Sequence, residues 1–216
     1  MNNKLDKNYK ITIITVTKNS ERHLEENILS VFNQTYKNYE HIIIDGDSED
    51  NTKNIIKKHI DKINYFISEP DKGLYYAMNK GIEKATGEII GILNSDDIYF
   101  PDALKIVNKY FVGDKNLDFL FGSVYKHKLL HGYNPKRIKW TFGFYTTHSV
   151  GFFIKKQAQK KVGFYDTQYK WSADYDFFYK MIVKFNLKGL ATKKNEIVGK
   201  FRRGGISSKI KYLDFL

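Results

Sequence analysis

The stretch Glu88-Ile89-Ile90-Gly91-Ile92-Leu93-Asn94-Ser95-Asp96-Asp97 joins an apolar run directly to two adjacent carboxylates. The apolar run predicts a buried strand, and open α/β sheets bind ligands at the carboxyl ends of their strands. Adjacent carboxylates repel each other, and their oxygens suit Mg²⁺ or Mn²⁺ bridged to a substrate phosphate. The stretch therefore predicts a metal–diphosphate site at a sheet edge. The alternative is a solvated turn before the helix that follows Pro101.

A second acidic cluster, residues 45–52 (DGDSEDNT), follows the apolar run His41–Ile44. About one strand–helix–strand unit separates the two clusters, so both are expected on the same rim of a parallel sheet. A third apolar run, Ile11–Thr17, precedes a helical pattern for which Asn19 or Ser20 is the expected N-cap. One cleft can then hold both acidic clusters.

Strand and helix patterns alternate through the first 124 residues, which is typical of an α/β fold with a doubly wound, mostly parallel sheet and helices on both faces. Strands are expected at 11–17, 41–44, 65–67, 88–93 and 119–124, and helices from Leu24, from about Thr52 with Ile60 facing inward, over 74–85 with Gly87 as C-cap, and after Pro101. Beyond residue 125 the pattern is less regular, until a strand at 150–154 and a helix at 173–185.

Six motifs in order give the chain a specific resemblance to family 2 glycosyltransferases with the GT-A fold, close to the bacterial subgroup that builds O-antigen and other surface polysaccharides. The matching segments are 15–19 (TVTKN), 30–36 (SVFNQTY), 45–52, 69–81 (EPDKGLYYAMNKG), 85–88 (ATGE) leading into 94–97 (NSDD), and 173–178 (ADYDFF). The resemblance spans residues 10 to about 207. It implies one domain, residues 1–216, with a nucleotide-sugar-binding half (about 10–124) and a smaller acceptor-binding half with a C-terminal loop (about 125–216).

For the donor, the resemblance implies a nucleotide sugar, taken here as a UDP-sugar, with Mn²⁺ or Mg²⁺ as cofactor. The implied donor residues are the backbone of Thr15 and Thr17 and the side chain of Asp45 at the base, Asn19, Asp71 and Lys72 nearby, Asp96 at the ribose or metal, and Asp97 as direct metal ligand. For Asp45 and Asp71 the alternative is a structural turn residue.

Transfer with inversion requires a base on the acceptor hydroxyl and charge neutralisation on the departing diphosphate. Asp174 occupies the position of the family's base. Many relatives have Glu-Asp where this chain has Ala173-Asp174, a variant shared with the O-antigen-type subgroup. The alternative is that Asp174 or Asp176 only complements the positive end of a helix.

Three further residues are implied at the donor diphosphate. His148 is a candidate metal ligand or hydrogen-bond donor to the leaving group, or else a hydrogen-bonded structural residue. Arg202 and Arg203 precede two glycines and resemble a mobile phosphate clamp, the alternative being a solvated tail.

Charge is distributed unevenly along the chain. Residues 1–118 hold 16 Lys and Arg against 19 Asp and Glu, a net −3, whereas residues 119–216 hold 20 against 5, a net +15. A basic surface with interleaved aromatics fits an anionic membrane that presents a pyrophosphate-linked substrate, or nucleic acid, or is simply a solvated lysine-rich surface. The acidic rims oppose nucleic acid, because carboxylates repel a phosphate backbone.

Composition is compatible with a reducing cytoplasm, since the chain has no Cys. Its first ten residues are polar and no apolar run approaches the ~20 residues of a membrane span. We therefore expect a cytoplasmic enzyme, peripheral at the inner face of the plasma membrane, with a saccharide acceptor linked to undecaprenyl pyrophosphate. The alternatives are a nucleotidyltransferase, for which residues 17–20 lack the expected glycine-rich loop, and a non-enzymatic nucleic-acid-binding module.

Overall fold

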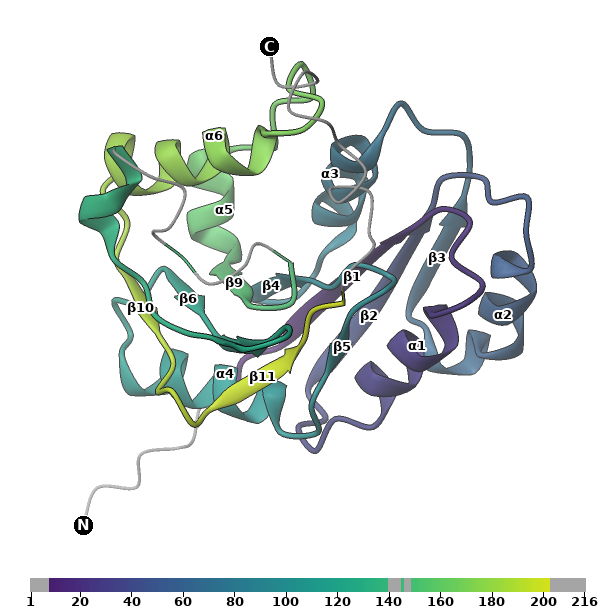
Figure 1. Cartoon of the computed structure of the whole chain (residues 1–216), viewed down its shortest axis with the longest axis horizontal. Helices are drawn as coiled ribbons and strands as arrows, with labels where there is room; N and C mark the ends of the chain where they lie inside the picture. The colour runs from purple at the N-terminus through teal and green to yellow at the C-terminus, as the bar shows by residue number, and fades with distance from the viewer. Residues whose placement is uncertain (1–7, 140–144, 146–148, 203–216) are drawn as a thin grey trace.

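A seven-stranded sheet in the order β10-β6-β9-β4-β1-β2-β3 forms the centre of the computed structural model, which describes residues 8–139, 145 and 149–202 (Figure 1). Its strands are β1 (Ile11–Thr17), β2 (Tyr39–Asp45), β3 (Tyr65–Ser68), β4 (Ile89–Ile92), β6 (Phe119–Phe121), β9 (Phe152–Lys155) and β10 (Gly189–Ala191). β1 pairs in parallel with β2 and β4, and β2 with β3, while β9 runs antiparallel between β4 and β6. The carboxyl ends of β1 to β4 therefore share one edge.

Helices cover both faces of this sheet, and the buried apolar residues on the two faces form separate clusters (Figure 1). One face carries α1 (Leu24–Phe32), α2 (Thr52–Lys58) and α4 (Ala103–Gly113), and the other carries α3 (Leu74–Lys84), α5 (Lys156–Val162) and α6 (Ala173–Tyr179). Two 3₁₀ turns, η1 (Ile60–Lys62) and η2 (Pro135–Lys139), and a π-helical turn, η3 (Lys180–Lys184), complete the helical elements of the described residues. The predicted α/β class with a mostly parallel sheet is confirmed.

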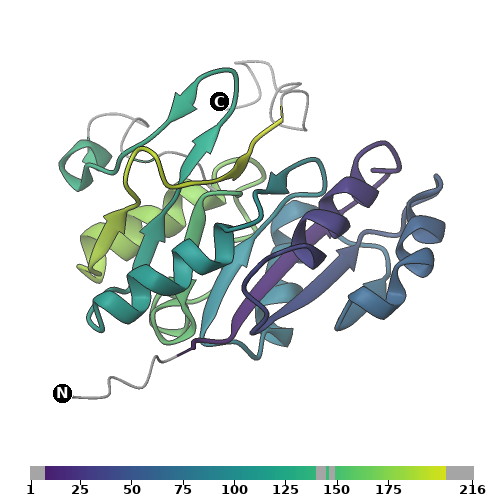
Figure 2. The ribbon, with the colours of Figure 1, turned by 90° about the horizontal axis from the view of Figure 1, so that it is seen from below.

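A smaller four-stranded sheet has the order β5-β11-β7-β8 and lies beside the main one (Figure 2). Its strands are β5 (Ile98–Tyr99), β7 (Ser123–Tyr125), β8 (Leu129–Leu130) and β11 (Ile197–Lys200). The single strand predicted over 119–124 was wrong, because the chain leaves the main sheet at Gly122 and enters the smaller one as β7. A Cβ on Gly122 would lie 2.5 Å from Val198 Cγ2, so this crossing needs glycine.

Several local predictions were also wrong. His23, not Asn19 or Ser20, takes the N-cap position of α1, and Ile60 is 51% exposed instead of inward-facing. The C-cap of α3 is Ala85, while Gly87 packs against the first strand, where a Cβ would lie 2.7 Å from the backbone nitrogen of Thr12. The helix predicted over 173–185 is α6 followed by the π-helical turn. The sequence patterns did not predict β5, β8, β10, β11 or α5.

The segment 85–88 has a structural role that its place among the family motifs did not reveal. Glu40, 6% exposed in β2, accepts hydrogen bonds from the backbone N–H groups of Thr86 (2.6 Å) and Gly87 (3.1 Å) and pairs with Lys10 at 2.8 Å. Burial alone would raise the pKa of Glu40, but hydrogen bonds from Lys10, Thr12 and Thr86 outweigh it and lower the pKa to about 2. An ionised carboxylate thus fixes the chain before β4.

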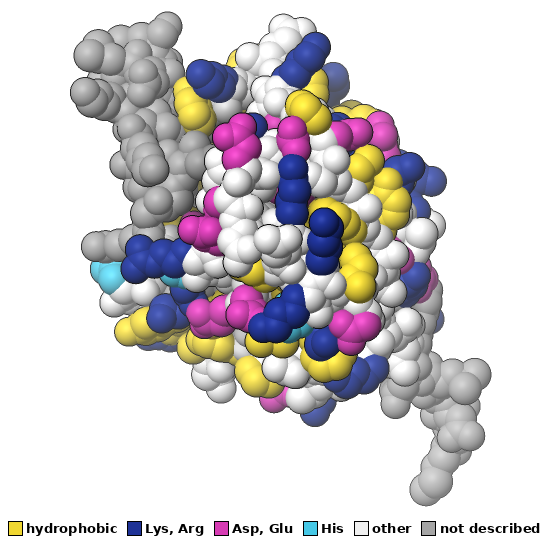
Figure 3. All heavy atoms as spheres, turned by 90° about the vertical axis from the view of Figure 1, so that its right-hand side faces the viewer, with side chains coloured by type: hydrophobic (Ala, Val, Ile, Leu, Met, Phe, Trp, Pro, Cys, Tyr) yellow, Lys and Arg dark blue, Asp and Glu magenta, His cyan; other side chains and the backbone are white. Residues whose placement is uncertain are grey.

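The β3 edge of the main sheet is protected by charged side chains. Lys84 Nζ lies 5.5 Å from the ring centroid of Tyr65, and Lys80 pairs with Glu69 at 2.6 Å. Figure 3 shows this side of the molecule, with Lys and acidic side chains interspersed among hydrophobic ones. Such charges disfavour pairing of an exposed edge strand with another chain.

His41 belongs to a buried polar network between β1, β2 and α1. Its Nε2 lies 2.9 Å from Thr15 Oγ1, which itself donates to Asn27 Oδ1 at 3.2 Å. Because a hydroxyl has one hydrogen, Nε2 of His41 must carry the proton and donate to Thr15. Burial lowers the pKa of His41 from 6.5 to about 3, so the imidazole is neutral in the folded protein.

This neutral histidine predicts an acid sensitivity. Between pH 6.5 and about 3 the unfolded chain binds a proton at His41 that the folded chain does not, so this stability is present above pH 6.5 and lost as the pH falls. His41 should lower the free energy of unfolding by about 2 kcal/mol between pH 8 and pH 5, at ~1.4 kcal/mol per pH unit below 6.5. Urea unfolding of His41→Gln at both pH values should lack this loss.

The matched control is His131→Gln, since His131 is exposed. It should keep the pH dependence of the wild-type protein. Equal pH dependence of wild type and His41→Gln would show that His41 is not the group responsible.

Candidate active site

The loops after β1, β2 and β4 meet at the shared carboxyl edge. The backbone N–H of Asn19 donates to Ser48 Oγ at 2.8 Å, and Asn19 Oδ1 accepts from the N–H of Glu49 at 2.9 Å. Ser20 Oγ lies 2.8 Å from Ser95 Oγ, next to the acidic pair. The prediction that both acidic clusters lie on one rim is therefore confirmed. Asn19, with φ of 50°, braces the loops against each other.

Asp45 is fully buried at the end of β2, and its carboxylate is held by two serines. It accepts hydrogen bonds from Ser48 N–H (3.0 Å), Ser48 Oγ (2.5 Å) and Ser68 Oγ (2.6 Å). These bonds fix the loop that follows β2. Its contact with a nucleotide base stays a prediction.

Asp71 lies beside the same loop, in the turn that precedes α3. A Cβ on Gly46 would lie 2.7 Å from Asp71 Oδ2, so a side chain at position 46 would displace this carboxylate. Asp71 Oδ1 accepts from the N–H of Gly73 at 2.9 Å, and Gly73 has φ of 134°, where a side chain would be strained. Lys72 is exposed next to this turn. Asp71 is thus a turn residue at the rim, which leaves its nucleotide contact a prediction.

Thr15 and Thr17, both buried in β1, differ in how their hydroxyl groups are used. The hydroxyl of Thr15 is engaged by Asn27 and His41 inside the molecule. The hydroxyl of Thr17, at the strand end, has no hydrogen-bond partner among the described residues. A buried hydroxyl without a partner is unfavourable, so Thr17 has a hydrogen-bonding group available to a ligand or water at the rim.

Asp97, like Asp45, is a fully buried carboxylate of the site. Its Oδ2 accepts from Ser149 Oγ at 2.9 Å, and its Oδ1 accepts from the backbone N–H of Arg202 at 2.9 Å. Burial and the negative charge of Asp96 raise the pKa of Asp97 to about 7, despite these hydrogen bonds. The negative charge of the pair is therefore only partly compensated by the protein.

The side chain of Arg202 crosses this loop toward α1. Its Nη1 lies 2.5 Å from His23 Nδ1, and its Nη2 contacts the carboxylate of Glu26. Because a guanidinium only donates, His23 accepts through Nδ1 and is neutral, in keeping with a pKa lowered by burial and by Arg202. Burial raises the pKa of Asp96, which a backbone hydrogen bond and the positive charge of Arg202 partly offset. Phosphate binding by Arg202 stays a prediction and would compete with Glu26.

The acidic pair fits a divalent cation only if the substrate adds ligands. Among the residues that the structure describes, no three His, Cys, Asp or Glu side chains gather closely enough to hold a metal ion alone. Two carboxylates with incompletely compensated charge do suit Mg²⁺ or Mn²⁺, which usually takes its other ligands from phosphates and water. Asp96 and Asp97 are therefore suitable residues for such an ion together with a diphosphate.

Asp174 lies in the first turn of α6 and is held from α3. Tyr75 donates its phenolic hydrogen to Asp174 Oδ1 at 3.0 Å. Because α3 begins at the carboxyl edge, this contact places Asp174 at the same edge as the acidic loops. Asp176 instead pairs with Lys180 at 2.6 Å, so of the two carboxylates Asp174 is the better placed as a base.

Two predicted residues, His148 and Arg203, lie outside the described part of the chain. Four residues of the site were missed from the sequence: His23, Asn27, Tyr75 and Ser149. Asn27 had a usable signal, since it is a polar residue at an inward-facing position of α1 together with Leu24, Ile28 and Val31. Its Nδ2 donates to the carbonyl oxygens of Asn94 and Asp97, both at 2.9 Å.

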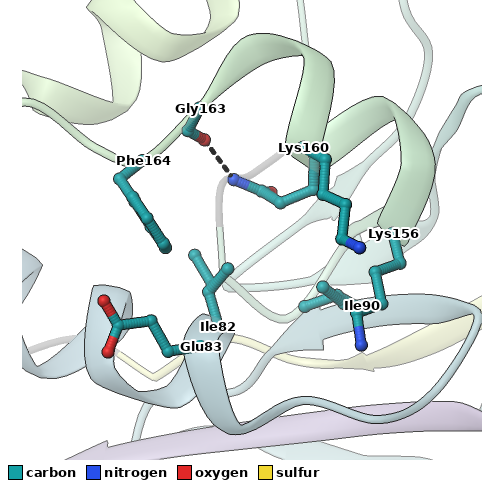
Figure 4. A pocket seen from close by; sticks show the side chains of 8 residues that line it. Ile82, Glu83, Ile90, Lys156, Lys160, Gly163 and Phe164 are labelled. Carbon is teal, nitrogen blue, oxygen red and sulfur yellow. Dashed lines mark hydrogen bonds between the residues drawn. The ribbon is translucent and has the colours of Figure 1, made fainter.

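A pocket of about 340 Å³ lies away from this edge, between α3 and α5 (Figure 4). Its lining includes Ile82, Ile90 and Phe164, and none of the predicted site residues. Lys156 Nζ donates to the carbonyl of Ala85 at 2.5 Å, and Gln159 donates to the carbonyl of Gly163 at 2.7 Å. Because none of the predicted site residues lines it, the pocket is distinct from the candidate active site.

Comparison with known proteins gives the class of the protein. Residues 12–181 match the model of Glycosyl transferase family 2. An uncharacterised glycosyltransferase of Rickettsia typhi is 30% identical over 187 residues, 80% of this chain and 58% of that protein. UDP-Glc:alpha-D-GlcNAc-diphosphoundecaprenol beta-1,3-glucosyltransferase WfgD of Escherichia coli is 33% identical over 116 residues, 53% of this chain and 46% of WfgD.

Solved structures share the fold at low identity. TarS of S. aureus in complex with UDP-GlcNAc superposes with a TM-score of 0.77 at 19% identity, over 94% of this chain and 61% of that one. Mannosyltransferase PcManGT of Pyrobaculum calidifontis, in complex with GDP-Man and Mn²⁺, gives 0.70 at 16% identity, over 94% and 59%.

The chain therefore belongs to glycosyltransferase family 2 and has the GT-A fold. It spans about six-tenths of the length of the first relatives, 58% of the Rickettsia typhi protein and 64% of an uncharacterised glycosyltransferase of Methanocaldococcus jannaschii. Within residues 8–139 and 149–202, no helix is long and apolar enough to cross a membrane.

Proposed function

We propose that this chain is an inverting, metal-dependent glycosyltransferase domain that moves a sugar from a UDP-sugar to a saccharide linked to undecaprenyl pyrophosphate, in O-antigen or other surface polysaccharide synthesis. The observation that carries the proposal is the Asp96-Asp97 pair at the carboxyl edge, where the pKa of Asp97 is raised to about 7 by burial and by its neighbour. The printed name of WfgD, with UDP-Glc as donor and a diphosphoundecaprenol acceptor, supports the substrate classes.

In this proposal Asp97 holds Mn²⁺ or Mg²⁺ directly, and Asp96 meets the metal or the ribose. When bound, the ion neutralises charge on the departing diphosphate. The base and ribose are surrounded by Asp45, Asp71, Lys72, Asn19, Thr15 and Thr17. The diphosphate is contacted by His148, Arg202 and Arg203. The buried hydroxyl of Thr17, which has no partner among the described residues, supports a ligand at this rim.

Asp97→Ala should weaken the Mn²⁺-dependent part of UDP binding more than about 10-fold, because a metal ligand is removed from a site that offers few others. Calorimetric titration of UDP with and without Mn²⁺ measures this effect. Asp61→Ala removes an exposed carboxylate and is the matched control. Unchanged Mn²⁺-dependent binding in a folded Asp97→Ala protein would contradict the metal assignment.

Asp174 is the general base of the proposed reaction. Its Oδ2 takes the proton of the acceptor hydroxyl while the hydroxyl oxygen forms a bond to the anomeric carbon and the bond to the diphosphate oxygen breaks, with inversion. Ala173, Phe177 and Phe178, all buried in the aromatic core, anchor the helix that carries Asp174. A rigid support of this kind favours a fixed position of the carboxylate.

Asp174→Asn should bind UDP-sugar and metal nearly normally yet lose roughly 10²–10⁴ in transfer rate, since the amide keeps the shape but accepts no proton. Steady-state transfer and calorimetric donor binding separate the two effects. Asp176→Asn, two residues along the same helix, is the control and should lose far less. Parallel loss of donor binding in Asp174→Asn would assign the residue to the donor site instead.

Contact with anionic lipid at the inner face of the plasma membrane is the remaining part of the proposal, and it would keep the cytoplasmic enzyme at a lipid-linked acceptor. In η2, Lys136, Arg137 and Lys139 are exposed around the buried Ile138. Each basic residue near an anionic surface contributes ~1 kcal/mol, screened by salt.

A triple variant, Lys136→Ala/Arg137→Ala/Lys139→Ala, should therefore lower flotation with vesicles that contain phosphatidylglycerol and leave binding to phosphatidylcholine vesicles unchanged. The control removes the same charge from exposed lysines elsewhere, Lys57→Ala/Lys105→Ala/Lys115→Ala. Equal flotation of both variants would contradict the η2 surface, and tight salt-sensitive binding of RNA would favour the nucleic-acid alternative.

A further inference from the structure

Tyr75 makes a hydrogen bond that joins the two halves of the chain at the reacting side. It lies in the first turn of α3, is 7% exposed, and donates to Asp174 Oδ1 at 3.0 Å across 99 residues of sequence. Since the first turn of α6 carries Asp174, this bond connects the ends of two helices that belong to different halves.

The direction of this hydrogen bond is fixed. Burial and the negative charge of Asp174 raise the pKa of Tyr75 well above its usual range, so the phenol keeps its proton. A protonated phenol beside a carboxylate donates to it. One oxygen of Asp174, Oδ1, is therefore committed to Tyr75, and Oδ2 is the oxygen that remains to accept a proton.

Further contacts hold both partners in place. Asn79, one turn along α3, donates to the carbonyl of Tyr165 at 2.9 Å and accepts from the Tyr165 N–H at 3.0 Å. The ring of Tyr165 lies 5.6 Å from that of Tyr75 and 4.8 Å from that of Phe177 on α6, measured between centroids. Backbone bonds and packed rings thus fix α3 relative to the helix that carries Asp174.

The same end of α3 is built into the donor side. The helix starts at the turn in which Asp71 accepts from Gly73, and Asp71 lies against Gly46 at the end of β2. Tyr75 follows this turn by two residues. The contacts of α3 therefore fix the position of Asp174 relative to the rim on which the donor is expected.

We propose that Tyr75 is a positioning residue for the transfer reaction: its hydroxyl fixes the carboxylate of Asp174 so that Oδ2 faces the acceptor hydroxyl. This inference rests on the proposed function, because it requires Asp174 to be the base. Tyr75 keeps its own proton throughout, and the proton of the acceptor moves only to Asp174 Oδ2.

Tyr75→Phe removes the hydroxyl and keeps the ring in the core. Its kcat for sugar transfer should fall roughly 10- to 100-fold, as expected when a catalytic group is held less well, while donor Kd and the KM values stay near wild type. Tyr76→Phe is the matched control on the next residue, whose side chain is exposed, and should transfer at the wild-type rate. Thermal melting checks that rates are compared per folded molecule.

A double-mutant cycle separates positioning from any independent role. If Tyr75 acts through Asp174, Tyr75→Phe should lower kcat no further in an Asp174→Asn background. Additive losses, or a Tyr75→Phe enzyme with normal kcat beside an impaired Asp174→Asn enzyme, would overturn the positioning role alone. Near wild-type transfer by Asp174→Asn would overturn the proposed base, and the role of Tyr75 with it.

Discussion

The arrangement of the acidic loop after β4 depends on hydrogen bonds from the buried side-chain amide of Asn27. Two carboxylates side by side in a partly buried loop repel each other, so the loop needs support from neutral donors. Asn27 gives this support by donating hydrogen bonds to the backbone carbonyls of Asn94 and Asp97. Within the described part of the chain it makes no hydrogen bond to the carboxylates of the pair, whose oxygens it therefore leaves to other partners. Its oxygen accepts from Thr15, which continues the network to His41 beneath the sheet edge. The acidic loop is thus anchored in the core.

The parallel half of the fold could be predicted from the sequence because its strands are continuous apolar runs. β1 has the predicted bounds, Ile11–Thr17, and β2 to β4 differ from their predicted bounds by no more than two residues at an end. Their shared edge follows from parallel pairing, so the meeting of the two acidic clusters was also predictable. The second half was less predictable, because β8 and β10 are only two or three residues long and carry too few positions for a periodic pattern.

For the candidate site, residue types were predictable and their partners were not. The sequence indicated Asp97 and Asp174, but Ser149, Tyr75 and the backbone N–H of Arg202 approach them from elements distant in the chain. The apolar pattern of α1 could have revealed Asn27, whereas no local pattern marks Tyr75 among the 16 tyrosines of the chain. Side-chain partners of this kind depend on helix packing, which a single sequence does not specify.

The passage of the chain from β6 to β7 at Gly122 affects when the site can form during folding. Because β7 belongs to the smaller sheet, β11 must return to pair with it, and only then does the N–H of Arg202 reach Asp97, 105 residues earlier in the chain. Closing so large a loop costs more entropy than forming the local β1-to-β4 units. During synthesis the parallel half can therefore assemble first. The hydrogen bond from the Arg202 N–H to Asp97 can form only after residue 202 has left the ribosome.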